Sequence, residues 1–345
     1  MKRCLQLAKM GAGHAAPNPM VGAVLVYEDR IIGEGFHQQY GGPHAEVNCI
    51  NSVAENDLSL IAKTVLYVSL EPCSHFGKTP PCTDLIIEKK IPIVVIACRD
   101  SSELVNGSGI KKLQAAGVNV IVGILEKEAL ELNKRFFIFH QYHRPYIILK
   151  WAQSNDDKIA GGDGSRTFIS NEYTNRLVHK WRSEEAAILV GTNTALQDNP
   201  ALTTRFWQGD DPVRLVIDMQ LKLPSTLQLF DGKTKTIVFN EQKHTNGEML
   251  SYYKVDKGEQ MLTQILNLLY EQQLTSVIVE GGAKLLQSFI NEGLWDEARV
   301  ITNELPIAIG MAPGNGVDAP VLTNATLYSA EELFTDQIAY YFKQT

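Results

Sequence analysis

Short apolar runs, separated by polar or turn-forming residues, mark the first part of the chain. Two β-rich runs, 21–27 and 30–36, are joined by Glu28 and Asp29, and this pattern predicts a hairpin. Three further strands, each after a plausible helix, are predicted at 64–70, 93–98 and 118–122. An amphipathic segment, 126–137, is predicted to close this part as one helix. Such alternation of strand and helix is typical of a mixed sheet covered by helices.

The same α/β pattern returns further along the chain. A polar, aromatic stretch at 140–145 precedes a new apolar strand at 146–151, so we place a domain boundary near Arg144. Later strands are predicted at 186–190, 214–217, 236–239, 276–279 and 297–302. The segment 241–260 is polar, and we expect an irregular surface excursion there. The sequence thus predicts an α/β protein with two domains, 1–143 and 144–345.

Length and composition agree with two globular domains. A chain of 345 residues, 44% hydrophobic and 21% charged, can bury a core in each half. Its apolar runs are far shorter than the roughly 20 residues that span a bilayer, and its N-terminus lacks the apolar core of a secretory signal. We therefore expect a cytoplasmic protein that does not contact membranes.

Charge and cysteine content narrow the class of function. The formal net charge of -7 argues against a general nucleic-acid binder, which needs a basic field to displace phosphate counterions. This net charge is still compatible with a small phosphorylated ligand that a few local cations hold. Five cysteines do not suggest a disulfide framework. Three of them lack a chemical setting and are expected in the core: Cys4, Cys49 and Cys98.

The clearest chemical signal is His44-Ala45-Glu46, followed by Pro72-Cys73 and Pro81-Cys82. One imidazole and two thiolates supply three ligands for a tetrahedral zinc ion and leave a fourth position for water, as in catalytic sites. Zinc lowers the pKa of that water, and Glu46 can carry a proton from it to a departing amine. Zinc deaminases have this order of residues, although here eight residues separate the cysteines. Either motif alone is weak evidence, and only the combination at strand-to-helix junctions favours a site.

The runs Pro17–Gly22, His44–Glu46 and Glu71–Cys82, with its long loop between the cysteines, resemble the deaminase domain of bifunctional riboflavin-biosynthesis deaminase-reductases. The resemblance implies a three-layer, cytidine-deaminase-like fold and a phosphoribosylated diaminopyrimidinone substrate. It also implies four substrate contacts, of which the lysine supplies charge for a phosphate: Asn18, His37, His75 and Lys78. The alternative interpretation is that His75 and Lys78 are solvated loop residues without a ligand.

In the second half, the strand 277–279 runs through Gly281-Gly282 into a helix, and a helix N-terminus behind glycines can bind a phosphate. This turn is no Rossmann fingerprint and is more often structural. Together with other segments it resembles the dihydrofolate-reductase-like domain of the same family. The segments are Lys150-x-Ala152-x-Ser154, Gly191-Thr192-x-Thr194, Asp198-Asn199-Pro200-x-Leu202-x-x-Arg205 and Glu280-Gly281-Gly282.

This second resemblance implies an NADPH site and a substrate site. The NADPH site would be lined by Ala152, Thr194, Asp198, Gly282, Ala283, Lys284, Leu285 and Leu286. The substrate would be held by Ser165, Arg182, Leu202, Arg205 and Glu280. Two arginines suit bidentate recognition of a ribose phosphate, and Lys150 would assist ring opening of the ribose.

Two departures from the family pattern accompany the resemblance. Ser154-Asn155-Asp156-Asp157 stands where the family usually has Ser-Leu-Asp-Gly, a change that can alter the geometry of the turn. The stretch 165–169 is also one residue longer than expected.

The sequence therefore predicts a bifunctional enzyme with one zinc ion per chain. It would deaminate 2,5-diamino-6-(5-phosphoribosylamino)pyrimidin-4(3H)-one and then use NADPH to reduce the ribosyl group to ribityl. We expect small-molecule partners, no nucleic acid and no membrane, and a homo-oligomer. Two alternatives stay open: a nucleic-acid or nucleoside deaminase with an accessory domain, which would need a basic groove with stacking aromatics, and a non-catalytic zinc-binding protein, which would not need Glu46.

Overall fold

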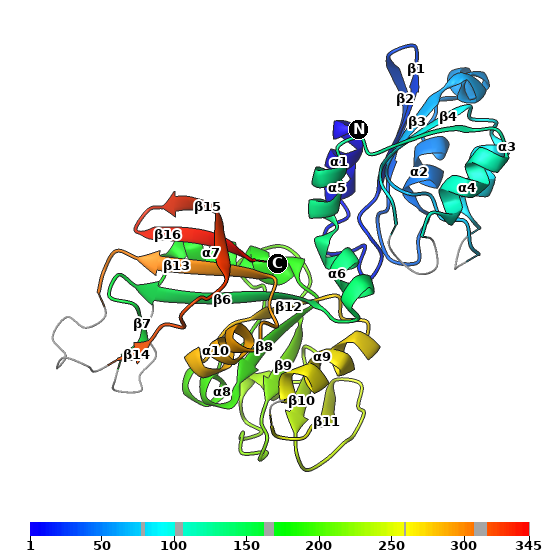
Figure 1. Ribbon diagram of the computed structural model, residues 1–345. Coiled ribbons are helices and arrows are strands. Elements are labelled where there is room, and N and C mark those ends of the chain that lie inside the picture. The colour runs from blue at the N-terminus through cyan, green and yellow to red at the C-terminus, as the bar shows by residue number, and fades with distance from the viewer. Residues whose placement is uncertain (77–79, 101–105, 162–168, 259, 307–315, 345) are drawn as a thin grey trace. The chain divides into compact units, whose positions relative to one another are not determined.

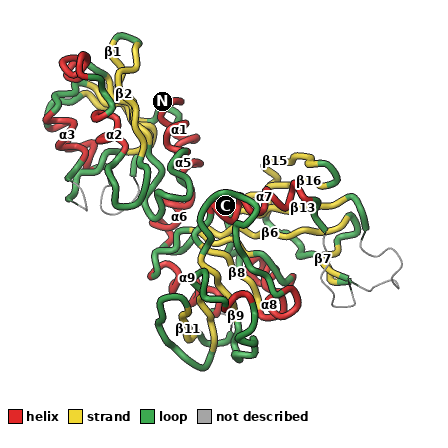
Figure 2. The backbone as a smooth tube through the Cα atoms, turned by 180° about the vertical axis from the view of Figure 1, so that it is seen from behind, coloured by secondary structure: helices red, strands yellow, loops and turns green. Residues whose placement is uncertain are grey.

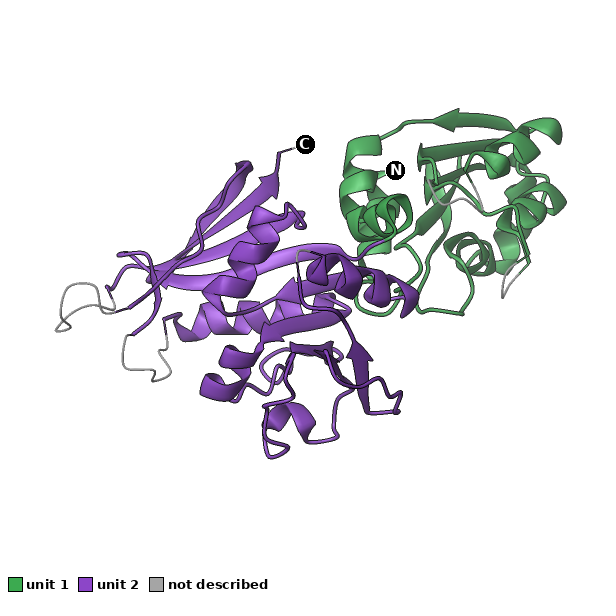
Figure 3. Ribbon diagram, turned by 60° about the horizontal axis from the view of Figure 1, so that its bottom comes forward, with its two compact units in different colours: residues 1–143 green, residues 144–345 purple. Residues whose placement is uncertain are grey.

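The computed structural model describes residues 1–76, 80–100, 106–161, 169–258, 260–306 and 316–344. The chain divides into two compact units, residues 1–143 and residues 144–345 (Figure 3). In the described part of the chain, no helix combines the length and the apolar character needed to cross a membrane.

Unit 1 is built on a mixed sheet with the strand order β2-β1-β3-β4-β5 (Figure 1). The strands are β1 (Gly22–Tyr27), β2 (Arg30–Phe36), β3 (Val65–Leu70), β4 (Ile93–Cys98) and β5 (Asn119–Val122). β1 is antiparallel to β2 and β3, whereas β3, β4 and β5 are parallel. The hairpin prediction is confirmed: Glu28 and Asp29 have φ of 44° and 63°, as a tight two-residue turn requires.

Helices cover both faces of this sheet (Figures 1 and 2). One face carries α2 (Ala45–Asn51), α3 (Cys82–Glu88) and α4 (Ser108–Ala115), and their apolar side chains share one core with the strands. The other face carries α1 (Lys2–Lys9), α5 (Glu126–Leu132) and α6 (Lys134–Tyr142). A 3-10 helix, Glu55–Lys63, leads into β3. The predicted layered α/β architecture is therefore confirmed for this unit.

The prediction of one helix over 126–137 was wrong. Its helical pattern is interrupted at Asn133, where α5 ends and α6 begins. The buried Asn133 side chain accepts a hydrogen bond from Met20 N (2.8 Å) and donates one to Met20 O (2.9 Å). This contact with a residue far away in sequence is compatible with a break that the amphipathic pattern alone could not reveal.

Unit 2 contains a second mixed sheet with the order β11-β10-β9-β8-β12-β6-β13-β16-β15. The strands are β6 (Tyr146–Ser154), β8 (Ala187–Gly191), β9 (Val213–Ile217), β10 (Thr236–Asn240), β11 (Leu250–Lys254), β12 (Ser276–Val279), β13 (Glu297–Asn303), β15 (Ala325–Leu333) and β16 (Asp336–Lys343). Pairing is parallel from β11 to β13 and antiparallel for β16 and β15. Two short strands, β7 (Lys158–Ala160) and β14 (Val317–Asp318), pair separately.

The expectation of an irregular segment over 241–260 was wrong in part, because β11 lies within it and extends the sheet beside β10. In β11 the buried positions are Ser251 and Tyr253, so the strand lacks the usual apolar alternation. The Ser251 hydroxyl is satisfied by donating to Gly247 O at 2.9 Å. Local hydrogen bonding thus lets a polar residue occupy a core-facing position.

Alternate residues of β6 serve two different environments. Ile147, Leu149 and Trp151 belong to the core formed with α9 (Met261–Glu271) and α10 (Ala283–Asn291). Lys150 and Ala152 therefore point to the opposite face of the sheet. That face carries α7 (Glu172–Glu184), and the view from behind in Figure 2 shows this face of the sheet. A further helix, α8 (Thr192–Asp198), follows β8, and a 3-10 turn spans Gln228–Phe230.

Candidate active sites

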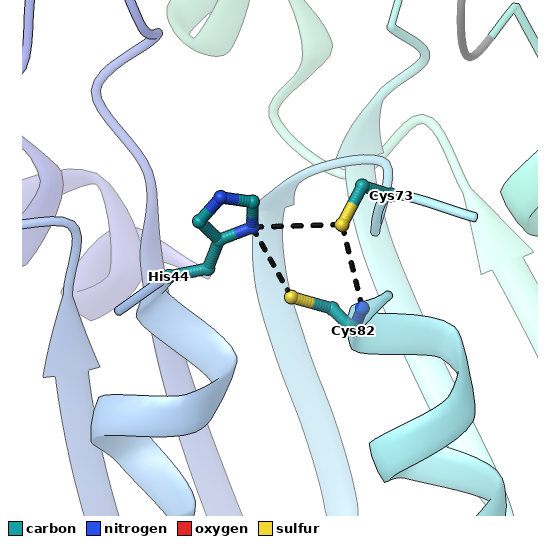
Figure 4. A group of neighbouring side chains, drawn as sticks. All are labelled: His44, Cys73 and Cys82. Atoms are coloured by element: carbon teal, nitrogen blue, oxygen red, sulfur yellow. Dashed lines mark hydrogen bonds between the residues drawn. The ribbon is translucent and has the colours of Figure 1, made fainter. Parts of the chain in front are cut away.

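The three side chains predicted to bind zinc converge in unit 1 from separate elements (Figure 4). His44 is the N-cap of α2, Cys73 lies just beyond β3, and Cys82 begins α3. His44 Nδ1 is 3.5 Å from Cys73 Sγ and 3.3 Å from Cys82 Sγ. Among the described residues, no other group of His, Cys, Asp and Glu side chains is arranged to hold a metal.

Hydrogen bonds within this cluster favour the thiolate form of Cys73, which is the form that binds a cation. The Cys73 thiolate accepts from the Cys82 side chain, from His44 and from the Cys82 backbone N–H (3.3 Å), and these contacts lower the pKa of Cys73 to about 4. The pKa of Cys82 is raised, because its proton is shared with Cys73 and burial disfavours a second charge. Two sulfurs and an imidazole nitrogen are a donor set that fits zinc, whose positive charge would favour the second thiolate.

Glu46 lies in the first turn of α2, two residues after His44, and is 3% exposed. Burial raises the pKa of its carboxyl, and the neighbouring Cys73 thiolate adds to the effect. It does not belong to the ligand group. A buried carboxyl with a raised pKa is suited to exchanging protons near neutral pH.

Two of the predicted substrate contacts border the ligand cluster. His37 is buried, with Nδ1 3.1 Å from Pro43 O and Nε2 3.1 Å from Asn18 Nδ2. Its ring stands at 82° to the ring of His44, with 5.5 Å between the centroids. Because Nδ1 must donate to the carbonyl, Nε2 is the acceptor for Asn18, and burial lowers the pKa of this imidazole.

The loop between the cysteines carries the other two predicted contacts. His75 is half-buried, and its Nδ1 is buried without a hydrogen-bond partner among the residues that the structure describes. Lys78 lies outside the described residues.

In unit 2, three of the predicted residues form a buried ion cluster. Arg182 on α7 donates to both oxygens of Glu280, which follows β12, at 2.8 and 2.6 Å. Lys150 Nζ on β6 is 3.9 Å from Glu280 Oε2. Burial opposes ionisation of Glu280, but the charges of Arg182 and Lys150 outweigh it and lower its pKa to about 2. Burial also lowers the pKa of Lys150.

The segment that follows α8, which contains Leu202 and Arg205, contacts the same cluster through Thr203. Arg182 Nη1 donates to Thr203 O at 3.2 Å. Leu202 is buried and has φ of 53°, so its backbone forms a sharp bend. Arg205 Cζ lies 4.8 Å from the centroid of the Phe206 ring. Ser165 falls outside the described residues.

Two residues near this segment were missed by the sequence analysis. Asp211 Oδ1 accepts from Thr204 N (2.7 Å) and from Thr204 Oγ1 (2.8 Å), next to Arg205. His179 is 1% exposed, and its ring packs at 4.8 Å against the ring of Phe206. Burial and the nearby positive charges of Arg182 and Arg205 lower the pKa of His179 to about 4. The spacing of His179 and Arg182, three apart on one helix face, is the signal that could have indicated it.

Two of the predicted NADPH elements, the turn at Gly281-Gly282 and Thr194 of α8, meet in unit 2. Gly281 and Gly282 have φ of 144° and 71°, and Gly282 caps α10. A Cβ on Gly281 would come within 2.9 Å of Thr194 Cγ2, so the close approach of this turn to α8 requires glycine. The first turn of α10 leaves backbone N–H groups without helical partners, which fits a phosphate.

The remaining residues predicted to contact NADPH differ in how deeply they are buried. Leu286 is fully buried in the core and Leu285 packs partly against it. Any contact of these two with a dinucleotide would therefore come mainly from their backbone. Ala152 lies on β6 and Asp198 ends α8.

The turn after β6 contains the departure from the family pattern, Asn155-Asp156-Asp157. Asp157, at the position of the usual glycine, has φ of 56°. Aspartate tolerates this left-handed conformation better than most residues. Gln153 Nε2 donates to Asp157 Oδ1 (2.7 Å), and Asp157 N donates to Ser154 O (3.0 Å). Most of the other departure, the stretch 165–169, lies outside the described residues.

Comparisons with protein families divide the chain in the same order. Residues 1–98 match the cytidine and deoxycytidylate deaminase zinc-binding region. Residues 145–336 match the RibD C-terminal domain.

Whole-chain relatives and solved structures agree. Riboflavin biosynthesis protein RibD of Aquifex aeolicus is 40% identical over 324 residues, covering 91% of this chain and 89% of the relative. The Escherichia coli protein of the same name is 35% identical over 86% of this chain and 84% of its own length. The solved structure of the Thermotoga maritima diaminohydroxyphosphoribosylaminopyrimidine deaminase/5-amino-6-(5-phosphoribosylamino)uracil reductase superposes with a TM-score of 0.89, at 35% identity, and covers 99% of this chain and 97% of that one. Acinetobacter baumannii RibD gives a TM-score of 0.88 at 29% identity, covering 100% and 98%.

Proposed function

The chain belongs to the RibD family of bifunctional riboflavin-biosynthesis deaminase-reductases, and from that premise we propose which substrates and residues its two activities use. Unit 1 hydrolyses the 2-amino group of 2,5-diamino-6-(5-phosphoribosylamino)pyrimidin-4(3H)-one to give 5-amino-6-(5-phosphoribosylamino)uracil and ammonia. Unit 2 then reduces the ribosyl group of that product to ribityl. The names of the Thermotoga maritima enzyme's two activities support this choice of substrates.

In unit 1, His44, Cys73 and Cys82 hold one zinc ion per chain. When bound, zinc makes water a nucleophile at neutral pH. Glu46 takes a proton as water adds to the pyrimidine carbon and returns one to the departing amine, so ammonia leaves as the carbonyl forms. Its burial beside the ligands, outside the ligand group, is the single observation that carries this assignment.

The other side chains of unit 1 orient the substrate. Asn18 and His37 border the ligand cluster and offer polar atoms to the pyrimidine, while His75 and Lys78 receive the ribose phosphate side of the molecule. Among the described residues, Nδ1 of His75 has no hydrogen-bond partner, and this supports a contact with a ligand. Among these four, only Lys78 carries a fixed charge for a phosphate.

In unit 2, NADPH supplies the hydride. The turn at Gly282, the backbone of 283–286 with Lys284, and the side chains of Thr194, Asp198 and Ala152 hold the dinucleotide. Arg182 and Glu280 hold the substrate, together with Ser165, the bend at Leu202 and Arg205. Lys150, whose pKa is lowered by burial, gives a proton to the ribose ring oxygen as the ring opens.

The test measures two reactions and the metal on one protein. We expect about one zinc per chain, ammonia release from the diaminopyrimidine and NADPH oxidation with the aminouracil. Cys73→Ser and Cys82→Ser should each lose most of the zinc and the ammonia release, because each removes one of three protein ligands. Full zinc occupancy in both variants would reject the ligand assignment. A cytoplasmic location and a homo-oligomeric state stay predictions.

A further inference from the structure

Glu71 directly follows β3, two residues before Cys73, and the residue is 4% exposed. We infer that Glu71 is a positioning residue of the metal centre, which fixes the Cys73 ligand by tying its loop to the first turn of α4. The inference rests on the proposed function in one respect, namely that Cys73 is a zinc ligand.

Both oxygens of Glu71 are occupied by backbone N–H groups. Oε1 accepts from Gly109 N (3.0 Å) and Ile110 N (3.1 Å) in the first turn of α4. Oε2 accepts from Gly107 N (3.2 Å) and Asp100 N (3.3 Å). A carboxylate with this many backbone donors is a fixed anchor, and the positive end of the α4 dipole strengthens it.

Two further contacts join the same loop to α4. Ser74 Oγ lies 2.6 Å from Ser108 Oγ, so the residue after Cys73 is held as well as the residues before it. A Cβ on Gly109 would come within 2.1 Å of Pro72 O. The backbone before Cys73 therefore packs closely against the start of α4, and the residue after Cys73 is joined to α4 through its side chain.

The ligand Cys73 is held between α4 and the helix of the second thiolate. Its carbonyl accepts from Thr83 N (3.2 Å) and Thr83 Oγ1 (3.1 Å) in the first turn of α3, which Cys82 begins. The separation of the two sulfurs thus depends on how α3 and α4 hold the residues around Cys73. Removing the Glu71 anchor should loosen one ligand while the fold of the sheet stays intact.

Glutamine at position 71 keeps the size of the side chain but replaces one acceptor oxygen with an N–H donor. That donor would face backbone N–H groups, so the loop would lose part of its attachment. Because outer partners of metal ligands typically change metal affinity by about 10- to 100-fold, we expect zinc to leave Glu71→Gln about 10 to 100 times faster.

The experiment follows zinc release from the full-length, zinc-loaded protein to the chromogenic chelator 4-(2-pyridylazo)resorcinol. Glu88→Gln is the matched control, because it makes the same chemical change at an exposed position of α3. Among the described residues, the Glu88 side chain forms a hydrogen bond only with Lys89. Visible absorption of the cobalt-substituted protein reports the geometry around the metal independently of activity. We expect a changed cobalt spectrum in Glu71→Gln and a wild-type spectrum in Glu88→Gln.

A purely structural role would lower the unfolding temperature of Glu71→Gln but leave zinc release and the cobalt spectrum at wild-type values, and that result overturns the inference. Should Glu71→Gln fail to fold, Glu71→Asp decides, because it keeps the carboxylate but shortens the side chain, so that its oxygens no longer reach all four backbone N–H groups. Glu71→Asp should release zinc several times faster than Glu88→Gln, and an unchanged rate would reject the positioning role of Glu71. Wild-type protein that retains no zinc would instead contradict the proposed metal centre itself.

Discussion

The metal-ligand cluster of unit 1 and the ion cluster of unit 2 differ in what they bring together. Unit 1 gathers electron-pair donors, two sulfurs and an imidazole nitrogen, beside a carboxyl whose pKa is raised. Unit 2 gathers opposite charges, with Arg182 and Lys150 around Glu280, whose pKa is lowered to about 2. In the proposed function an added cation completes the first cluster, whereas the charges of the second stabilise one another.

This difference predicts different consequences of mutation. A change at Glu46 should affect chemistry and leave the fold unaltered, because burial raises the pKa of its carboxyl and therefore favours a neutral side chain at this position. A change at Glu280 should affect both, because it leaves buried positive charges without a partner. Four predictions test this contrast, from the largest expected effect to the smallest.

The largest effect is expected for Glu46→Gln. Glutamine keeps the size of the side chain but cannot exchange a proton, so ammonia release should fall by a factor of about 10² to 10⁴. Zinc content and NADPH oxidation with the aminouracil should stay at wild-type values. Glu55→Gln, at an exposed site in the same unit, is the control. Normal ammonia release would remove Glu46 from its role, and loss of both activities in a folded protein would contradict two independent sites.

Glu280→Gln should destabilise unit 2 by about 3 kcal/mol, because breaking a buried pair leaves Arg182 and Lys150 uncompensated. NADPH oxidation should be lost, while ammonia release persists. All four tryptophans lie in 144–345, so urea unfolding followed by tryptophan fluorescence reports on unit 2 alone. Glu271→Gln, exposed at the end of α9, is the control. An unfolding midpoint equal to that of the control would contradict the view that Glu280 balances the cluster.

Arg205→Ala should raise the substrate KM of the reductase about 10- to 100-fold, since hydrogen bonds to a charged group are worth about 1.5–3 kcal/mol. The affinity for NADPH should change little, because the dinucleotide is assigned to the turn at Gly282. Steady-state kinetics, with the aminouracil and NADPH varied in turn, measures the KM of each separately. Arg176→Ala on the exposed face of α7 is the matched control. An unchanged substrate KM would exclude Arg205 from the site.

The smallest effect concerns pH and His179. Its folded pKa of about 4 lies below the usual value of 6.5, so the unfolded chain takes up a proton first as pH falls. Stability should therefore be full above pH 6.5 and decrease between pH 6.5 and 4, by about 1 kcal/mol once screening by solvent is taken into account.

His179→Gln should flatten this dependence, whereas His244→Gln, at an exposed site, should not. The charged groups that face the ring are Arg182, Arg205 and Glu280, of which Glu280 titrates only near pH 2. Urea unfolding followed by tryptophan fluorescence at several pH values measures how the free energy of unfolding depends on pH. Equal slopes in wild type and His179→Gln would show that this histidine does not carry the effect.

The ligand cluster could be predicted from the sequence because each ligand stands at a strand-to-helix junction of a recognisable pattern. His44 caps α2 and Cys82 opens α3, as the local sequence suggested. The Arg182–Glu280 pair was harder to predict, because its members are 98 residues apart and only the resemblance to a family joined them. Glu71 was missed in its role, since its partners are backbone N–H groups that leave no trace in residue identity.

The sequence by itself determined the α/β class, the parallel and hairpin strands with strong apolar patterns, and the donor set for a metal, because these depend on local periodicity and on residue chemistry. Only the tertiary structure decided the break at Asn133, the strand β11 with Ser251 facing inward, and the left-handed turn at Asp157. In each case a specific hydrogen bond satisfies a polar group, and that energy is absent from any pattern of hydrophobic and polar positions.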